Sequence, residues 1–91
     1  MNARTPCSVP FCPRSTKGAW AWWLCRDHWP LVDRALRLTR TRLKRRFRRL
    51  GLLEERDRWY RPLGPRATRA IAGVERRMIR QAIERATGIS T

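Results

Sequence analysis

Cys7-Ser-Val-Pro-Phe-Cys12 and Cys25-Arg-Asp-His28 are the two stretches that decide the fold of this chain. Together they hold all three cysteines and the only histidine. Four residues separate the first pair of ligands, two separate the second pair, and twelve lie between the pairs. Structural zinc is four-coordinate and is commonly bound by two such pairs, each carried by a tight turn or a helix start. The spacing therefore predicts one structural Zn²⁺ held by Cys7, Cys12, Cys25 and His28.

Two other interpretations of these residues stay open at this point. The cysteines are also compatible with free thiols and His28 with a helix surface, although a proline-flanked loop offers a thiol little core to enter. An iron–sulfur cluster would use the same thiolates, with histidine as the rarer ligand. An odd number of cysteines fits poorly with a disulfide framework, so we expect a reducing, cytoplasmic setting.

The length of 91 residues indicates one compact domain, which a bound metal would help to stabilise. We expect it to be small and α-rich, with a zinc knuckle and a short hairpin over 1–28, a long basic helix over 29–51, and a short helix, a Pro/Gly break and a C-terminal helix over 52–91. The N-terminus lacks the apolar segment of a signal peptide. The longest apolar run, Ala19–Leu24, is too short for a membrane span.

Residues 1–28 are rich in proline and show no helical period. The stretch 15–18 is typical of a turn, and Ala19–Leu24 is typical of a short strand that leads into Cys25. We therefore expect the knuckle at residues 7–12 to be followed by a small hairpin.

The stretch 29–51 has the periodicity of an amphipathic helix, with Asp27 as its N-cap and Gly51 as its C-terminal stop. Its apolar stripe consists of Trp29, Val32, Leu36, Leu43, Phe47 and Leu50.

Two further helices are predicted downstream. The charges of 52–61 suit the dipole of a short helix, and 62–65 then breaks the chain. The last helix runs from about Pro65 to Thr87, is capped by Gly88, and is expected to pack on the first. Its apolar side consists of Ala67, Ile71, Val74, Met78, Ala82 and Ile83. Gly73 is unfavourable in mid-helix unless another backbone approaches closely.

The N-terminal third resembles a known class of zinc protein. A knuckle, a hairpin and a ligand pair opening a helix resemble a treble-clef zinc finger. More narrowly, Cys7-x2-Pro10-x-Cys12 followed by Trp23-Leu-Cys25-Arg-Asp-His28-Trp29 is similar to small zinc proteins encoded by phages and prophages. The resemblance covers about residues 7–40 and implies metal binding, but says little about activity.

No catalytic machinery is expected. Treble-clef nucleases of the His-Asn-His type need histidines beyond the metal ligands, and this chain has only His28. Four protein ligands would also close the zinc to an activated water. Asp27 lies beside the site, but its N-cap role is the simpler interpretation. The sequence therefore predicts a protein that is not an enzyme.

The charge balance indicates a polyanionic partner. The chain carries 22 basic and 7 acidic residues, a formal charge of +15, and 34–49 contains no acid that could form pairs along the helix. Nucleic acid is the first expectation, with DNA ahead of RNA because a long basic helix fits a major groove. The predicted contact residues are Arg34, Arg37, Arg40, Arg42, Lys44, Arg45, Arg46, Arg48 and Arg49. A solvated helix surface and a protein or membrane partner are the alternatives.

Secondary contacts are expected from the second helix and from the aromatic residues. The candidates are Trp20, Trp22, Arg69, Arg76, Arg77 and Arg80. The five tryptophans can stack on bases, but packing in a small core is the simpler interpretation, above all for Trp29.

Two roles follow from these expectations. The first is a zinc-dependent nucleic-acid-binding protein, such as a phage accessory or regulatory factor. The alternative is an interaction module that docks on a host or viral complex and modulates or inhibits it. It would use the apolar arc around Ile71, Val74 and Met78 together with the tryptophan surface. A homodimer formed through the last helix is compatible with both.

Overall fold

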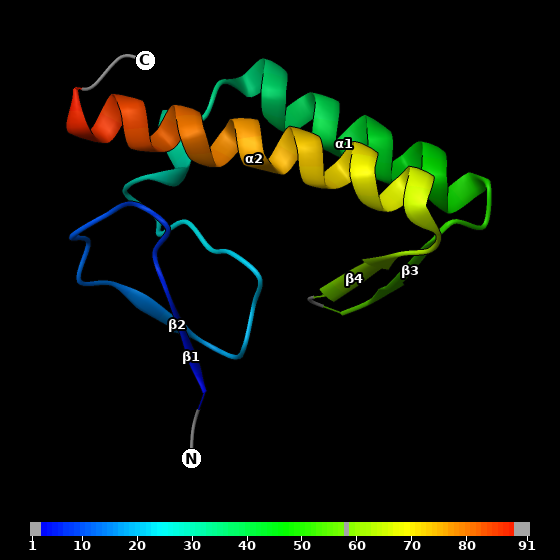
Figure 1. The fold of residues 1–91 in the computed structure, drawn as a ribbon, viewed down its shortest axis with the longest axis horizontal. Coiled ribbons are helices and arrows are strands. Elements are labelled where there is room, and N and C mark those ends of the chain that lie inside the picture. The colour runs from blue at the N-terminus through cyan, green and yellow to red at the C-terminus, as the bar shows by residue number, and fades with distance from the viewer. Residues whose placement is uncertain (1–2, 58, 89–91) are drawn as a thin grey trace. The chain divides into compact units, whose positions relative to one another are not determined.

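The computed structural model describes residues 3–57 and 59–88. They form a small α+β protein with two helices and two antiparallel hairpins (Figure 1). The elements are β1 (Arg4–Pro6), β2 (Ser15–Lys17), a 3-10 turn (Trp29–Leu31), α1 (Arg34–Arg49), β3 (Leu53–Arg56), β4 (Trp59–Pro62) and α2 (Pro65–Thr87). None of the described helices is long and apolar enough to cross a membrane.

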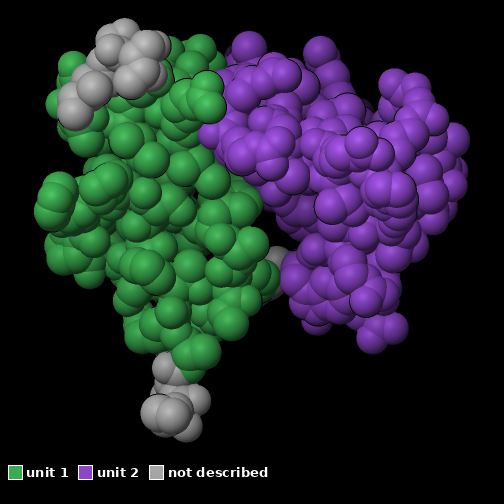
Figure 2. All heavy atoms as spheres, in the orientation of Figure 1, with its two compact units in different colours: residues 1–33, 78–91 green, residues 34–77 purple. Residues whose placement is uncertain are grey.

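The chain divides into two compact units, which are coloured separately in Figure 2. Unit 1 contains residues 1–33 and 78–91, and unit 2 contains residues 34–77. Helix α2 contributes its first part to unit 2 and its last turns to unit 1. That these units form the single domain expected from the sequence stays a prediction.

In unit 2, α1 and the first half of α2 share a core with a hairpin. Phe47 of α1, Leu53 of β3, and Ala67 and Ile71 of α2 are buried together. Leu43, Leu52, Tyr60 and Ala70 are partly buried and pack against this cluster. Leu50 ends the apolar stripe of α1 but is 57% exposed, because the chain turns away at Gly51, whose φ is 72°.

The short helix predicted over 52–61 is wrong, because this segment forms the β3–β4 hairpin. Leu53 pairs with Pro62 and Glu54 with Arg61, and the Glu54 carboxylate accepts a hydrogen bond from Arg61 Nη2 at 2.6 Å. The acidic and basic residues at the two ends of this segment suit a helix dipole, but they suit cross-strand pairing equally well. The aromatic pair Trp59-Tyr60 favours the strand.

The first helix begins at Arg34, five residues later than predicted. Trp29–Leu31 forms a 3-10 turn, and Val32 is extended, with ψ at 131°. Asp27 is not the N-cap of α1, because it forms an ion pair with Arg14 at 2.8 Å.

Asp33 anchors the segment before α1 to the last turns of α2 within unit 1. The Asp33 carboxylate accepts hydrogen bonds from Gln81 Nε2 and Arg85 Nη1, both at 2.8 Å. Arg85 Nη1 also donates to the carbonyl of Leu31 at 2.7 Å. These bonds hold residues 31–33 in place and favour a helix start at Arg34.

The predicted last helix is confirmed. α2 spans Pro65–Thr87, and Gly88 follows with φ at 73° and an N–H that donates to the Glu84 carbonyl at 2.8 Å. Nothing in the structure lies within 4 Å of the position that a Cβ would take at Gly73, so no close approach explains that glycine. The buried residues of this helix are Ala67, Ile71, Val74, Met78 and Ala82.

The first hairpin lies elsewhere than predicted. β1 and β2 flank the knuckle, with Arg4 opposite Lys17, so 15–18 is mainly strand and Ala19–Leu24 forms no strand. The Trp20 ring folds back and donates its Nε1–H to the Lys17 carbonyl at 2.8 Å. A Cβ on Gly18, whose φ is 105°, would lie 2.7 Å from that nitrogen. Glycine is therefore required here to reverse the chain against the indole.

None of the five tryptophans belongs to the buried core. Trp20 is 37% and Trp59 40% exposed, whereas Trp22, Trp23 and Trp29 are half-buried. The expectation that Trp29 is a core residue is therefore wrong. The buried side chains between residues 3 and 33 are smaller: Thr5, Cys7, Val9, Leu24, Cys25 and Val32.

Candidate metal centre

The side chains of Cys7, Cys12, Cys25 and His28 converge in unit 1. Their ligand atoms, three Sγ atoms and one imidazole nitrogen, all lie within 4.8 Å of one another. Cys7 and Cys25 are buried, and Cys12 and His28 are half-buried. All four residues singled out by the sequence are thus brought together at one point, in an arrangement that could hold a metal ion.

The spacing of these atoms fits a tetrahedral ion. His28 Nδ1 lies 3.4 Å from Cys7 Sγ and 3.2 Å from Cys25 Sγ, and the Sγ atoms of Cys12 and Cys25 are 3.9 Å apart. Zinc bonds of about 2.3 Å to sulfur and about 2.0 Å to nitrogen place tetrahedral ligands roughly 3.5–3.8 Å from one another. The four side chains would therefore need only small adjustments to bind such an ion.

The first ligand pair is placed by a tight turn at residues 7–12. The Cys12 N–H donates to the Val9 carbonyl at 3.2 Å, and the Cys7 N–H donates to the Arg14 carbonyl at 2.9 Å. Phe11 at the tip of this turn has a φ of 67°, a left-handed conformation that bulky residues rarely adopt. The turn thereby directs both thiols to the same side.

The second ligand pair is placed by a single helical turn. The N–H groups of His28 and Trp29 both donate to the Cys25 carbonyl, at 3.1 and 2.9 Å, so Cys25 and His28 lie on one face. The Ser8 N–H donates to the Trp23 carbonyl at 2.7 Å and joins the two ligand segments. The knuckle and the second ligand segment are therefore in contact through the backbone as well as through the site. The prediction that the second pair opens the long helix is wrong, because α1 begins only at Arg34 and this pair lies on a turn before it.

The thiols differ in their electrostatic environment. Burial raises the pKa of Cys7, and the hydrogen bond that its sulfur accepts from the Cys25 N–H at 3.5 Å offsets this only in part. Burial also acts to raise the pKa of Cys25. Hydrogen bonds to its sulfur outweigh burial and lower the pKa of Cys25. They come from the backbone of Asp27 and His28 and from the side chains of Cys7 and Cys12. Because metal ligation needs thiolates, binding is expected to release protons.

Three of the predicted nucleic-acid residues on α1 are engaged inside unit 2. Arg40 Nε lies 2.8 Å from Glu75 Oε2, and Arg40 Nη2 donates to the Tyr60 hydroxyl at 3.0 Å. The Tyr60 hydroxyl also donates to Glu75. Lys44 lies 4.1 Å from the centre of the Tyr60 ring. These basic residues therefore help to hold α1, β4 and α2 together.

The Glu55 carboxylate of β3 pairs with two basic residues of α1. Its carboxylate lies 3.5 Å from Lys44 Nζ and also pairs with Arg48. Burial and the neighbouring Arg40 guanidinium lower the pKa of Lys44. Burial acts to raise the pKa of Glu55, but Lys44 and Arg48 outweigh it and lower that pKa.

The other basic residues of α1 have a different environment. Arg37 is half-buried and makes contacts of its own. The other five are exposed, and none forms an ion pair with an acidic residue in the described part of the chain. They are Arg34, Arg42, Arg45, Arg46 and Arg49. Of the nine predicted residues, these five present their full charge to solvent.

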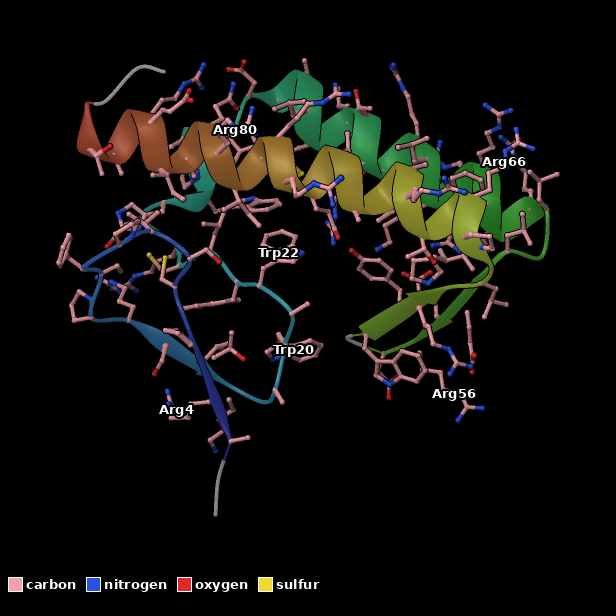
Figure 3. All side chains as sticks on the ribbon, in the orientation of Figure 1. Arg4, Trp20, Trp22, Arg56, Arg66 and Arg80 are labelled. Carbon is pink, nitrogen blue, oxygen red and sulfur yellow. The ribbon has the colours of Figure 1, made fainter. Side chains whose placement is uncertain are left out.

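The secondary candidates are also largely exposed. Arg69, Arg76, Arg77 and Arg80 lie on the solvent-facing side of α2. Figure 3 labels Arg66 in the first turn of this helix, Arg80 about two turns before its C-terminal end, and Trp20 and Trp22 on the loop after β2. Trp22 is half-buried and has contacts of its own, so it is less accessible than Trp20.

Sequence reasoning missed a second cluster of side chains in unit 1. Arg4, Arg14, Arg26 and Trp23 line an open depression of about 610 Å³, which Pro13, Ser15 and Cys25 complete. These residues are spread over three segments, and no periodicity or motif connects them. Only the pairing of β1 with β2 and the folding of residues 7–28 around the candidate metal site bring them together.

Comparisons with known proteins identify no relative of this chain. No protein-family model matches this chain, and no curated protein or solved structure matches it significantly. The resemblance to treble-clef and phage-encoded zinc proteins therefore stays a prediction.

Proposed function

We propose that this chain is a non-enzymatic nucleic-acid-binding protein that binds one structural Zn²⁺ and contacts the phosphate backbone with the exposed arginines of α1. The observation that carries the proposal is the division among the basic residues of that helix. Arg40, Lys44 and Arg48 are paired with Glu75 and Glu55 within unit 2, whereas five arginines face solvent without an acidic partner in the described chain. A solvated helix surface would be expected to mix both signs of charge.

The distribution of charge supports the same proposal. Residues 34–77 contain 16 basic and 4 acidic residues, so unit 2 accounts for +12 of the formal +15. Such a concentration of like charge opposes folding and draws a polyanion to the surface. Unit 2 is therefore the expected nucleic-acid-binding part of the chain.

The mechanism is phosphate neutralisation with release of condensed counterions. Five contacts to duplex DNA correspond to a slope of roughly −4 to −5 in log affinity against log salt concentration. Arginine suits this role because its planar guanidinium donates two parallel hydrogen bonds to a phosphate. We place duplex DNA ahead of RNA because the deep, narrow major groove of RNA does not admit a helix.

The donor chemistry supports zinc as the metal. Three thiolates and one imidazole with tetrahedral spacing are a common structural zinc set, and they leave no open position for a reactive water. Thiolate ligands also require a reducing compartment, in agreement with the expected cytoplasmic location. A role as a phage accessory or regulatory factor is part of the proposal, and the resemblance to small phage zinc proteins supports only its metal binding.

The alternative role as a protein-docking module keeps only part of its expected surface, because Trp20 is 37% exposed whereas the apolar arc of α2 is buried. Ile71, Val74 and Met78 are 1%, 4% and 0% exposed, so the apolar arc proposed for docking is buried within the chain itself. The same burial affects the helix face expected to form a homodimer. Dimerisation and protein partners stay predictions, and no feature of the described residues favours them specifically.

Fluorescence anisotropy with a labelled 20-base-pair duplex at several salt concentrations tests the proposal. The variant Arg42→Gln/Arg45→Gln should weaken binding and make the salt slope shallower by about 2, since each lost contact removes roughly 0.9. The matched control Lys17→Gln/Arg56→Gln removes the same charge from exposed positions outside α1 and should change the slope little.

Two results would contradict the proposal. Absence of nucleic-acid binding by the zinc-loaded protein at low salt would refute the proposal altogether. An equal loss of affinity in both double variants would show that net charge alone, rather than the α1 surface, drives binding. Tighter binding of structured RNA than of duplex DNA at the same salt concentration would reverse the order of the two nucleic acids.

A further inference from the structure

We infer that the depression in unit 1 lined by Arg4, Arg26 and Trp23 is a nucleotide site, which takes the phosphate on the two guanidinium groups and the base on the indole. The inference rests on the proposed function, because it names the form of nucleic acid that the protein prefers. It lies outside the α1 surface and uses residues that the proposed function does not need. The depression is open to solvent and has a volume of about 610 Å³.

The guanidinium of Arg4 is oriented by hydrogen bonds in a way that suits anion binding. Its Nε donates to Ser15 Oγ at 2.8 Å and its Nη2 donates to the Ser15 carbonyl at 3.1 Å. A guanidinium has five N–H donors, so three remain after these two bonds. Because β1 and β2 are paired at this point, the side chain loses little further freedom when it binds a phosphate.

Arg26 supplies the second positive charge. It is exposed, and its guanidinium has no ion-pair partner among residues 3–57 and 59–88. Arg14 also lines the depression, but its ion pair with Asp27 at 2.8 Å cancels its charge. The depression thus carries two uncompensated guanidinium groups, enough to neutralise one phosphate of a nucleotide.

Trp23 supplies a rigid aromatic surface. Its backbone carbonyl accepts a hydrogen bond from the Ser8 N–H at 2.7 Å, and its N–H donates to Ser8 Oγ at 3.4 Å. It lies two residues before Cys25, which also lines the depression. These bonds fix the backbone of Trp23, whose side chain lines the depression, and an indole placed there can stack on a base and strengthen binding.

Half of the basic residues of unit 1 line this depression, although the unit as a whole carries little net charge. Its segments contain only six basic and three acidic residues, a formal charge of +3. Three of those six basic residues, Arg4, Arg14 and Arg26, line this one depression. Guanidinium groups beside an indole match the two halves of a nucleotide, whereas an acidic peptide would use the charges alone.

The base must be unstacked to reach the indole. Bases in an intact duplex are paired and stacked, so the site would accept a nucleotide from a single-stranded end, loop or bulge, or a free nucleotide. We expect the protein to prefer nucleic acids that contain unpaired nucleotides over fully paired duplexes.

Anisotropy titration with two labelled probes tests this inference. One probe is a blunt 20-base-pair duplex and the other is the same duplex with a five-nucleotide single-stranded overhang. The protein should bind the overhang probe about 5- to 100-fold more tightly. Arg4→Gln/Arg26→Gln should abolish this preference and leave blunt-duplex binding nearly unchanged, whereas Lys17→Gln/Arg56→Gln should keep the preference. Arg26→Gln alone, at an exposed position, should reduce it without affecting folding.

A competition series distinguishes the sources of the ligand. Adenosine monophosphate should displace the overhang and shift the NMR signal of the Trp23 indole N–H, and inorganic phosphate at equal concentration should do so much more weakly. Indole shifts with adenosine monophosphate but no gain from the overhang would assign the site to free nucleotides. Equal competition by inorganic phosphate, or by an acidic phosphopeptide, would overturn the inference.

The failure of this inference is separable from that of the proposed function. Salt-sensitive binding of the blunt duplex without any gain from the overhang, and without indole shifts, would overturn the nucleotide site and leave the α1 proposal standing. Loss of blunt-duplex binding in Arg42→Gln/Arg45→Gln with the overhang preference retained would support both.

Discussion

Chelating the metal under reducing conditions should unfold the N-terminal part of unit 1 and leave unit 2 folded. The perturbation acts on the four ligands between Cys7 and His28, none of which lies in unit 2. Unit 2 has a core of its own around Phe47 and Ile71. The two units should therefore respond differently to the same treatment.

Chelation is expected to have a large effect because the N-terminal segment buries few apolar side chains. Besides two ligands and Thr5, the buried side chains between residues 3 and 33 are Val9, Leu24 and Val32. Three such side chains contribute about 5–9 kcal/mol. Structural zinc binding contributes on the order of 10–16 kcal/mol in small zinc modules. A zinc ion at this site would thus be the larger contribution, and the segment is not expected to stay ordered without it.

Amide hydrogen exchange measures this effect residue by residue. The N–H groups of Ser8, Cys12 and Trp29 are hydrogen-bonded and should be protected only in the metal-loaded protein. The amides of α1 and of the first half of α2 should keep their protection after chelation. Co²⁺ substitution gives an independent check, because thiolate-to-cobalt absorption should saturate at one ion per chain.

One outcome would refute the reasoning. If Ser8, Cys12 and Trp29 kept their protection in reduced, metal-free protein, the metal would not be what orders this segment. Loss of protection in α1 together with the N-terminal segment would instead show that the two units unfold as one.

Four further substitutions test the packing and the charge network by urea denaturation. Phe47→Ala should destabilise unit 2 by about 3–5 kcal/mol, because the side chain is 4% exposed, and a loss below about 1 kcal/mol would contradict its place in the core. Glu75→Ala should lower the free energy of unfolding by about 2 kcal/mol, because it leaves Arg40 and the Tyr60 hydroxyl without their shared acceptor in a partly buried site. Tyr60→Phe should lower it by about 1 kcal/mol, because it removes the hydroxyl that joins Arg40 to Glu75. Hydrogen bonds from Arg85 and Gln81 lower the pKa of Asp33, so its contribution to stability is present above about pH 4 and is lost as the pH falls through the lower folded-state value. Asp33→Asn should therefore flatten the dependence of stability on pH below about pH 4, and an unchanged profile would argue against this anchor.

The parts predictable from sequence are those that depend on local signals. The four metal ligands share one spacing pattern, and α2 is bounded by Pro65 and by Gly88, so both could be identified without a structure. The hairpin over 53–62 could not, because Glu54 and Arg61 satisfy a helix dipole and a cross-strand pair equally well.

Long-range contacts explain the remaining errors. The start of α1 depends on Asp33, whose partners Gln81 and Arg85 are about fifty residues away in the sequence. Which arginines of α1 stay accessible depends on acidic residues of β3 and α2, above all Glu55 and Glu75. Periodicity within a helix contains no information about partners so distant.

The discontinuity of unit 1 has a consequence for synthesis on the ribosome. Its metal ligands emerge early, but the turns of α2 that hold Asp33 are translated only after the whole of unit 2. During translation the nascent N-terminal segment would therefore have to rely on the proposed metal, before its helical partner exists. Metal starvation should accordingly expose this segment to proteases most strongly in newly made chains, whereas finished molecules keep the Asp33 anchor.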